Sequence, residues 1–435
     1  MNTQTEGHLK QSVGLWGVIS LGFGTAVGVS IFSVLSPAVA SAGPAVLWVL
    51  PITMVPMLIF ALVYAVMGSA DPVSGASFEW PRRYVHPLLA FMLSWTRITG
   101  TASALIVLTY VLVSYWQMVF DIPTKLSMFL VFLAVFLVNR AGIRSVARGQ
   151  GGMVALLLLT FLVLIVLSLP RVEPNQFVPW LPNGWSGFWA AVPLMVTLFL
   201  GIETATEVGS EIKKPKTTIP LGMALAIGLS ALLYGLVAFS AVGVLGGAAV
   251  SSTNAPLLVL AERLLGPWGQ AGIVFTATLS IGSSINAIFL VFTRYLLAMA
   301  RANMLPTPLG LIDPASGSPI NAQWLVLGIC ILGLLLPNDL AFLFIAVSIP
   351  SLLQYGAICY AATVLVRRYP DRYQGASFRL PKPVLFVLSG LGIVLMTMIL
   401  VLGLGTDVRP YGLLLIWGLV GIGYYGHRRQ IIKHG

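Results

Sequence analysis

The chain has 435 residues, of which 58% are hydrophobic and 9% are charged, and it carries a formal net charge of +11. Soluble proteins carry about 25% charged residues, so this composition excludes a water-soluble globule and favours an integral membrane protein. No polar stretch reaches about 40 residues, which leaves no room for a separate catalytic or nucleic-acid-binding domain. No nucleic-acid partner is therefore expected, and the lipid bilayer is the expected surrounding.

The apolar segments predict an all-α fold with twelve transmembrane helices. The first apolar run, from Val13 to Ser36, exceeds the ~7–15 residues of a secretory signal, so it is predicted to be a retained span. The third and eighth segments exceed the ~20 residues needed to cross a bilayer, which predicts tilted or extended helices. The predicted spans are 13–38, 45–68, 88–118, 126–139, 149–169, 188–209, 218–244, 270–299, 321–336, 340–366, 384–405 and 410–426.

The basic residues predict the orientation of these spans. An even number of spans places both termini on one side of the membrane. Of the 24 Lys and Arg residues, 18 lie on the side of the termini. Four lie on the opposite side, namely Lys125, Arg171, Arg263 and Arg409, and Arg97 and Arg294 fall within spans. By the positive-inside rule, both termini are cytoplasmic. The predicted location is the plasma membrane, as a multi-pass protein of a bacterial inner membrane.

Two spans contain features that predict interrupted helices. Residues 22–32 of the first span are dense in glycine, and residues 199–207 of the sixth span place two carboxylates among apolar residues. Interrupted segments at corresponding positions of two halves are typical of inverted-repeat transporters with a site near the membrane midplane. An interruption exposes amide N–H groups on one half-helix and carbonyls on the other, which suits a zwitterion. The alternative is that the glycines only allow close helix packing.

Four segments, distributed over the whole chain, resemble motifs of the amino acid–polyamine–organocation transporter superfamily: 24–32, 64–78, 201–220 and 294–306. Ser30 stands where that family usually has a glycine, and Val66 and Ala76 replace an acid and a glycine. The resemblance implies a LeuT-like core of five plus five inverted-repeat helices, with discontinuous helices 1 and 6. The implied division is a tail (1–12), a first repeat (13–169), a second repeat (188–366), two additional helices (384–426) and a tail (427–435).

The resemblance also implies a substrate site. Backbone amides around Val29 and Ser30 would hold a carboxylate, carbonyls from Leu198 to Gly201 would receive an ammonium group, and Phe199 would serve as a lid. Together with intramembrane charges, the predicted substrate-binding residues are Thr25, Ala26, Gly28, Val29, Ser30, Arg97, Leu198, Phe199, Gly201 and Glu203.

Ionisable side chains at membrane depth are functional candidates. Counting ~1.5 Å per residue places Arg97 and Glu203 at comparable depth, where they could face one another. One interpretation is a structural ion pair between them. In the other, the two groups act separately: Arg97 binds a substrate carboxylate, or Glu203 exchanges a proton during transport. Glu207 lies one turn beyond Glu203 and is predicted to gate or pair. Arg97, Glu203 and Glu207 are therefore the gating and coupling candidates.

The coupling ion has two interpretations. Proton-linked relatives often carry a lysine on the fifth helix, and this chain has none there. Serine oxygens of the eighth span, with carbonyls of the first, resemble the sodium site of sodium-coupled transporters of this fold, and oxygen ligands suit a hard cation. The alternative is that these serines bond only to backbone, with proton coupling or exchange. The sodium candidates are Gly24, Val27, Ser280, Ser283 and Ser284.

The sequence therefore predicts a secondary transporter of neutral L-amino acids that works by alternating access. A neutral substrate is favoured if Arg97 and Glu203 neutralise each other. An acidic amino acid is the alternative if Arg97 is free, and a polyamine or other organic cation is the alternative if Glu203 is free. A membrane-embedded enzyme is disfavoured, because the sequence offers no His or Cys partner for a nucleophile at membrane depth. No cofactor is expected apart from Na+ as a coupling ion, and the expected state is a monomer or homodimer.

Overall fold

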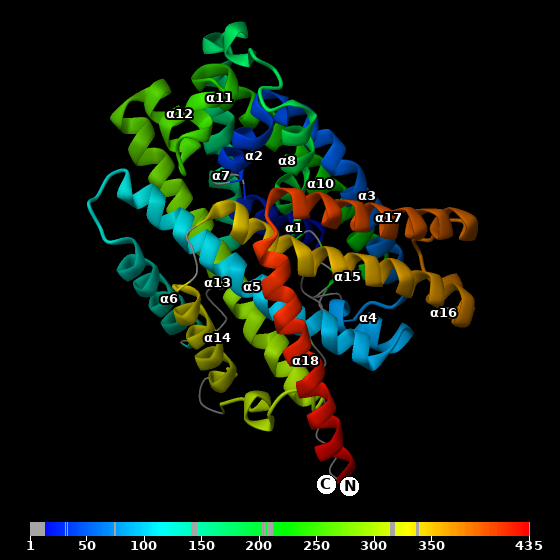
Figure 1. Cartoon of the computed structure of the whole chain (residues 1–435). Coiled ribbons are helices and arrows are strands. Elements are labelled where there is room, and N and C mark those ends of the chain that lie inside the picture. The colour runs from blue at the N-terminus through cyan, green and yellow to red at the C-terminus, as the bar shows by residue number, and fades with distance from the viewer. Residues whose placement is uncertain are drawn as a thin grey trace.

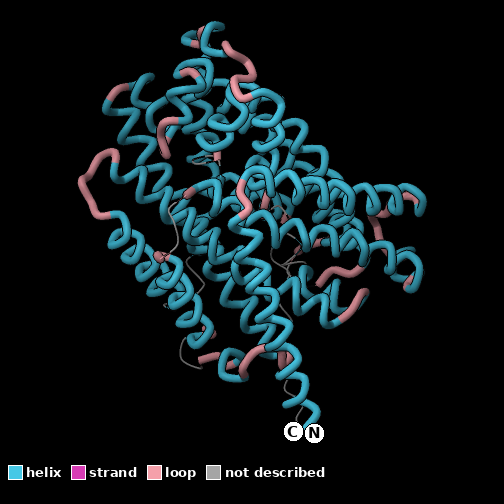
Figure 2. Tube along the Cα trace, in the orientation of Figure 1, coloured by secondary structure: helices cyan, strands magenta, loops and turns pink. Residues whose placement is uncertain are grey.

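The computed structural model describes residues 14–30, 32, 34–73, 75–140, 146–201, 203, 206, 212–313, 318–335 and 339–434. Over these residues the chain is a bundle of α-helices joined by short loops, and no β-strand is present in them (Figure 2). The all-α prediction is therefore confirmed for the described part of the chain.

Seven helical stretches of the described residues are long and apolar enough to cross a membrane. They are Leu35–Ala70 (α2, Leu35–Ala42, with α3, Val46–Ala70), α5 (Pro87–Gln117), Val154–Arg171 (mostly α7, Val146–Ser168), α10 (Pro215–Leu245), α13 (Pro267–Arg301), α15 (Leu340–Arg368) and α17 (Lys382–Thr406). The remaining predicted spans fall on α1 (Leu15–Ser30), α6 (Thr124–Arg140), α8 (Gly184–Val196), α14 (Ile320–Gly333) and α18 (Arg409–His434). All twelve predicted segments thus contain helix, and the number of membrane crossings stays a prediction.

Two further features concern segments outside the predicted spans. Residues 427–434, expected as a tail, continue α18 as helix. Arg428 accounts for part of this extension, because its guanidinium donates to the carbonyls of Asn303 and Leu305 at 3.3 and 3.4 Å. Short helices also lie between the predicted spans: α4 (Ala76–Tyr84), α11 (Gly247–Ser251), α12 (Pro256–Leu265) and α16 (Pro370–Gln374).

The two helices that will carry the site begin at well-defined caps. His86 precedes α5, and its Nδ1 accepts a hydrogen bond from the Leu88 N–H at 3.1 Å, while Pro87 occupies the first helical position. Asp339 precedes α15, and its carboxylate accepts from the N–H groups of Ala341 and Phe342.

Figure 1 shows how the helices are arranged. Helices α11 and α12 lie at one end of the bundle and α4 lies toward the other, with α5 running between them. Large apolar side chains such as Val387 and Val394 of α17, and Leu415 and Leu419 of α18, are exposed on the outside. An apolar exterior of this kind fits a bilayer rather than water, because soluble monomers rarely expose contiguous apolar patches of more than a few hundred Å².

Helical order is interrupted at the two predicted places. Helix α1 ends at Ser30 and α2 begins at Leu35. Helix α8 passes into a 3-10 turn, Thr197–Phe199, after which Gly201 adopts a left-handed φ of 100°. The glycine-dense stretch of the first span, 22–32, stays helical to Ser30, so the interruption falls at the C-terminal end of this stretch and not at its middle. Glycine weakens a helix by about 1 kcal/mol per residue, which tertiary packing can offset.

Candidate functional site

The second interruption sets the position of Glu203. Leu198 and Phe199 are buried, and the Phe199 ring packs edge-on against Tyr234 of α10 with centroids 6.0 Å apart. Phe199 therefore lies in the core in this conformation. Gly201 takes a φ that side-chain-bearing residues rarely adopt. The chain consequently turns back, and the Glu203 carboxylate accepts the Gly201 N–H at 3.0 Å.

Three parts of the molecule meet at the Glu203 carboxylate. Its Oε2 accepts the Gly201 N–H and also the Tyr355 hydroxyl of α15, at 2.7 Å. Its Oε1 lies 3.7 Å from Nη2 of Arg97 on α5. A buried carboxylate is costly unless it is both paired and hydrogen-bonded, and Glu203 has partners of both kinds. We call Arg97, Glu203, Gln354 and Tyr355 the buried charge cluster.

Arg97 forms the accessible side of this cluster. Its Nη1 donates to Oε1 of Gln354, the neighbour of Tyr355 on α15. The side chain of Arg97 is 21% exposed, whereas that of Glu203 is 7% exposed. A solute entering the cluster would therefore meet the guanidinium before the carboxylate.

Gln354 and Tyr355 were not among the residues predicted from the sequence. The Tyr355 ring is held by Phe60 and Tyr64 of α3, with centroids 5.1 and 5.5 Å away. The signal that could have found them is a pair of polar side chains inside the apolar span 340–366, since polar residues within membrane helices often hydrogen-bond across helices.

The first interruption is held by the opposite half of α5. Phe32 is buried, with its ring against Tyr115 of α5 and Phe161 of α7 at centroid distances of 5.6 and 5.5 Å. The Tyr115 hydroxyl donates to the Phe32 carbonyl at 3.0 Å. Helix α5 thus contacts both interruptions, through Tyr115 at the first and Arg97 at the second.

The first-span candidates lie in the last turns of α1, where the structure describes the backbone but not the side chains. These residues are Gly24, Thr25, Ala26, Val27, Gly28, Val29 and Ser30. Glu207 lies outside the described residues. The roles predicted for all of them stay predictions.

The serines of the proposed sodium site lie together on α13. Ser280 and Ser284 are buried, and the hydroxyls of Ser283 and Ser284 each donate to the Ser280 carbonyl at 3.1 Å. This is the backbone-bonding arrangement considered as the alternative. A hydroxyl that donates still has lone pairs for a cation, so the oxygen set fits Na+ chemically and the site stays a prediction. Among the described residues, no group of three His, Cys, Asp or Glu could hold a metal.

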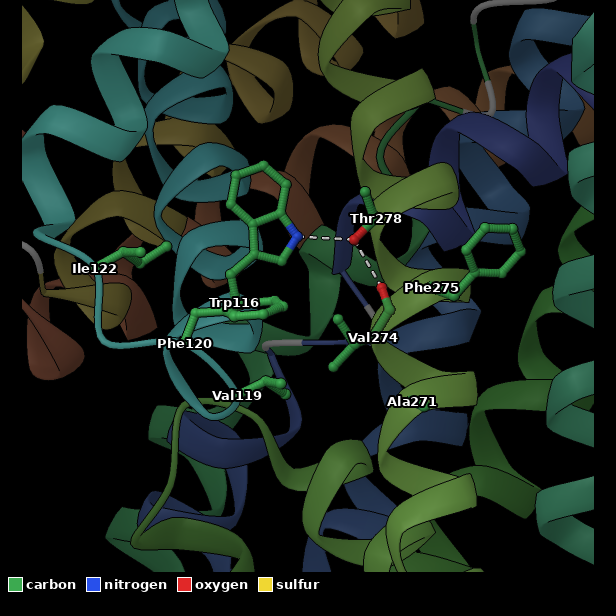
Figure 3. A pocket seen from close by; sticks show the side chains of 8 residues that line it. All are labelled: Trp116, Val119, Phe120, Ile122, Ala271, Val274, Phe275 and Thr278. Atoms are coloured by element: carbon green, nitrogen blue, oxygen red, sulfur yellow. Dashed lines mark hydrogen bonds between the residues drawn. The ribbon is translucent and has the colours of Figure 1, made fainter.

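Two surface cavities lie elsewhere. The larger, about 510 Å³, is an apolar hollow between the end of α5 and α13, where the Trp116 indole donates to the Thr278 hydroxyl at 2.8 Å (Figure 3). The smaller, about 300 Å³, is lined by Arg83, Tyr84, Tyr369 and Arg372 near α4. Neither is lined by a residue of the buried charge cluster.

Apolar helices around a buried charge cluster, with two interruptions that contact one shared helix, are typical of a multi-pass membrane protein. The chain belongs to the amino acid permease family, whose model matches residues 13–421. It is 26% identical to the branched-chain amino acid permease BcaP of Bacillus subtilis, over 97% of this chain and 94% of that protein. It is 24% identical to the methylthioribose transporter of Bacillus subtilis, over 88% of this chain and 86% of that protein. It is also 24% identical to cationic amino acid transporter 5 of Arabidopsis thaliana, over 75% of this chain and 60% of that protein.

Proposed function

We propose that this permease is a secondary transporter of neutral L-amino acids that works by alternating access around the two interruptions. The observation that carries the proposal is the contact of 3.7 Å between Arg97 and Glu203. The two charges neutralise each other, so the cluster offers no net charge to an acidic or basic substrate side chain. The similarity to a branched-chain amino acid permease supports the same substrate class.

In this proposal the backbone of the interruptions binds the zwitterionic part of the substrate. A helix leaves N–H groups unbonded at its N-terminus, so the N–H groups that begin α2, just after the first interruption, receive the carboxylate. Carbonyls from Leu198 to Gly201, at the end of the 3-10 turn that follows α8, receive the ammonium group. The partial charges at helix ends favour an anion at N–H groups and a cation at carbonyls. Glu203 already accepts the Gly201 N–H, so its carboxylate stabilises the interruption while the neighbouring carbonyls bind substrate.

An acidic amino acid, a polyamine or another organic cation is the second candidate class. It would require the Arg97–Glu203 pair to open, which would free one charge for the substrate. Similarity to a cationic amino acid transporter favours keeping this alternative.

Coupling is proposed to use Na+, H+ or exchange, with both termini cytoplasmic in a bacterial inner membrane and a monomer or homodimer as the working unit. The double variant Ser283→Ala with Ser284→Ala tests the Na+ alternative. If Na+ binds there, uptake by this variant should lose its response to Na+. Uptake that responds to Na+ as strongly as wild type, or that never responds, removes this site.

The substrate class is tested with purified protein and a panel of compounds read by thermal stabilisation, with and without Na+. A ligand that binds the folded state raises its stability by an amount set by concentration and affinity. Leucine, valine and methionine should raise the melting temperature, whereas glutamate, arginine and spermidine should not. Stabilisation by only the charged compounds would overturn the proposal. Counterflow in proteoliposomes then separates a transporter from a channel or a receptor.

A further inference from the structure

The last helix, α18, is joined to α5 by a reciprocal pair of hydrogen bonds. The Trp95 indole N–H donates to the carbonyl of Trp417 at 2.8 Å, and the Trp417 indole N–H donates to the carbonyl of Trp95 at 2.8 Å. The two rings stack with centroids 4.6 Å apart and planes 12° apart. Figure 1 shows α18 crossing the front of α5 in this region.

Gly421 makes the close approach sterically feasible. A Cβ atom on Gly421 would lie 2.5 Å from Cδ1 and 2.7 Å from Nε1 of Trp95. Any side chain there would push the indole away from the carbonyl that it reaches. Trp95, Trp417 and Gly421 therefore act as one unit, which we call the tryptophan clasp.

The clasp acts on the turn of α5 that carries Arg97. In this turn the Thr96 hydroxyl bonds to the carbonyls of Met92 and Leu93, and the Thr99 hydroxyl bonds to the carbonyl of Thr96. Trp417 adds a fourth side-chain bond, to the carbonyl of Trp95. Side-chain donors to helix carbonyls bend helices, so the backbone geometry at Arg97 depends in part on α18.

The direction of the side chains links the clasp to the charge cluster. Residues two apart on an α-helix point to nearly opposite faces, because each residue turns by about 100°. Trp95 faces α18, and Arg97 faces Glu203 and Gln354. A displacement of Trp95 toward or away from α18 therefore shifts Arg97 relative to Glu203.

We propose that Trp95, Trp417 and Gly421 are positioning residues that hold Arg97 opposite Glu203 through α18. The inference rests on the proposed function, in which this pair sets the substrate class. It gives the C-terminal helix, which lies outside the predicted inverted repeats, a role in the substrate site through the position of Arg97.

The test compares two Trp→Phe variants of the full chain in proteoliposomes. Trp417→Phe keeps an aromatic ring but removes the N–H that reaches Trp95. Trp116→Phe is the matched control, because it removes an indole hydrogen bond of the same length, to Thr278. Trp116 is on the same helix as Arg97, but it lies 19 residues, about 28 Å, further along that helix. The loss of one such bond corresponds to roughly a two- to tenfold effect.

Trp417→Phe should raise KM for the transported amino acid by roughly two- to tenfold, whereas Trp116→Phe should leave KM unchanged at a comparable loss of melting temperature. Gly421→Ala should raise KM in the same way, which keeps the test independent of one variant's folding. Equal KM values for Trp417→Phe and wild type, or an equal rise in Trp116→Phe, overturn the inference. If the wild-type protein transports no neutral amino acid, the proposed function is overturned instead. The same comparison of variants is then made with the compound that stabilises the protein in place of the neutral amino acid.

Discussion

Arg97 in the buried charge cluster and Arg409 at the surface both contact carboxylates, but their surroundings differ. Arg409 follows α17, its side chain is 52% exposed, and its Nη2 lies 2.6 Å from Oδ2 of Asp407 while also pairing with Asp339. Burial acts to raise the pKa of Asp407, and the hydrogen bonds and charge of Arg409 outweigh it, so the pKa lies below its usual range. Arg97 makes a longer contact, of 3.7 Å, to Glu203. The side chains of Asp407 and Glu203 are both 7% exposed, so the two pairs differ at the arginine, which is 52% exposed for Arg409 and 21% exposed for Arg97.

The comparison indicates that the distance between the charges does not decide which of these two ion pairs contributes more to stability. Exposed pairs gain little, because water and salt screen them and two long side chains must be ordered. Removing one partner of a buried pair costs about 3–5 kcal/mol, because the other charge is left uncompensated. The longer contact is therefore expected to matter more for folding and transport.

The largest effect is expected from Arg97→Gln or Glu203→Gln. Each leaves a buried group without its partner, so each should abolish uptake and lower the free energy of unfolding by about 3–5 kcal/mol. Arg294→Gln is the control, since Arg294 also lies in a predicted span but is exposed. Thermal melting and uptake measure both effects.

The double reversal Arg97→Glu with Glu203→Arg separates the roles of this pair. Recovery of the melting temperature would identify a structural ion pair. If neither folding nor uptake recovers, direct substrate or proton contact is favoured. Single variants that behave like Arg294→Gln would contradict the view that the buried pair matters more.

Tyr355→Phe should have the next largest effect. It removes the hydroxyl that reaches Glu203 at 2.7 Å but keeps the ring between Phe60 and Tyr64. The cost of a lost partner for a buried acceptor is about 1–3 kcal/mol. Tyr360→Phe, on the exposed face of the same helix, should melt like wild type, and equal melting of both variants would count against this ranking.

Asp71→Asn should have an intermediate effect. Asp71 is 13% exposed and accepts from the Tyr84 hydroxyl at 2.8 Å and from Arg83 at 3.4 Å. Burial raises the pKa of Tyr84, on α4 outside the spans, to about 12, so it stays a donor. The variant should lose about 1 kcal/mol, measured by chemical unfolding. Asp371→Asn, at an exposed position near Arg372, is the control, and a larger loss there would reverse the assignment.

Asp407→Asn should have the smallest effect, a shift of roughly 1–2 °C in melting temperature. Because the folded-state pKa of Asp407 is lowered, its contribution is present above the unfolded value of about 3.9 and is lost as pH falls through the folded value. The difference from wild type should therefore shrink in acid and at high salt. A difference that persists in about 1 M salt would mean that the contacts between Asp407 and Arg409 are not screened.

The sequence predicted the helical class and the two interruptions, and it singled out Arg97 and Glu203, which the structure brings to 3.7 Å of each other. Apolar length, glycine and rare charges are local signals. It did not predict the partners Gln354 and Tyr355, since Tyr355 lies 152 residues from Glu203. The clasp joins positions 322 residues apart. A helix that is apolar all round gives no periodic pattern from which its facing neighbours can be inferred.

Helix α5 is continuous over 31 residues and contacts one interruption through Arg97 and the other through Tyr115. The two contacts are about 27 Å apart along a helix whose length is fixed by its hydrogen bonds. A shift at one interruption therefore displaces the anchor of the other. In the proposed alternating-access cycle, this rigid linkage couples a rearrangement at one interruption to a rearrangement at the other, so that the site opens to one side of the membrane at a time.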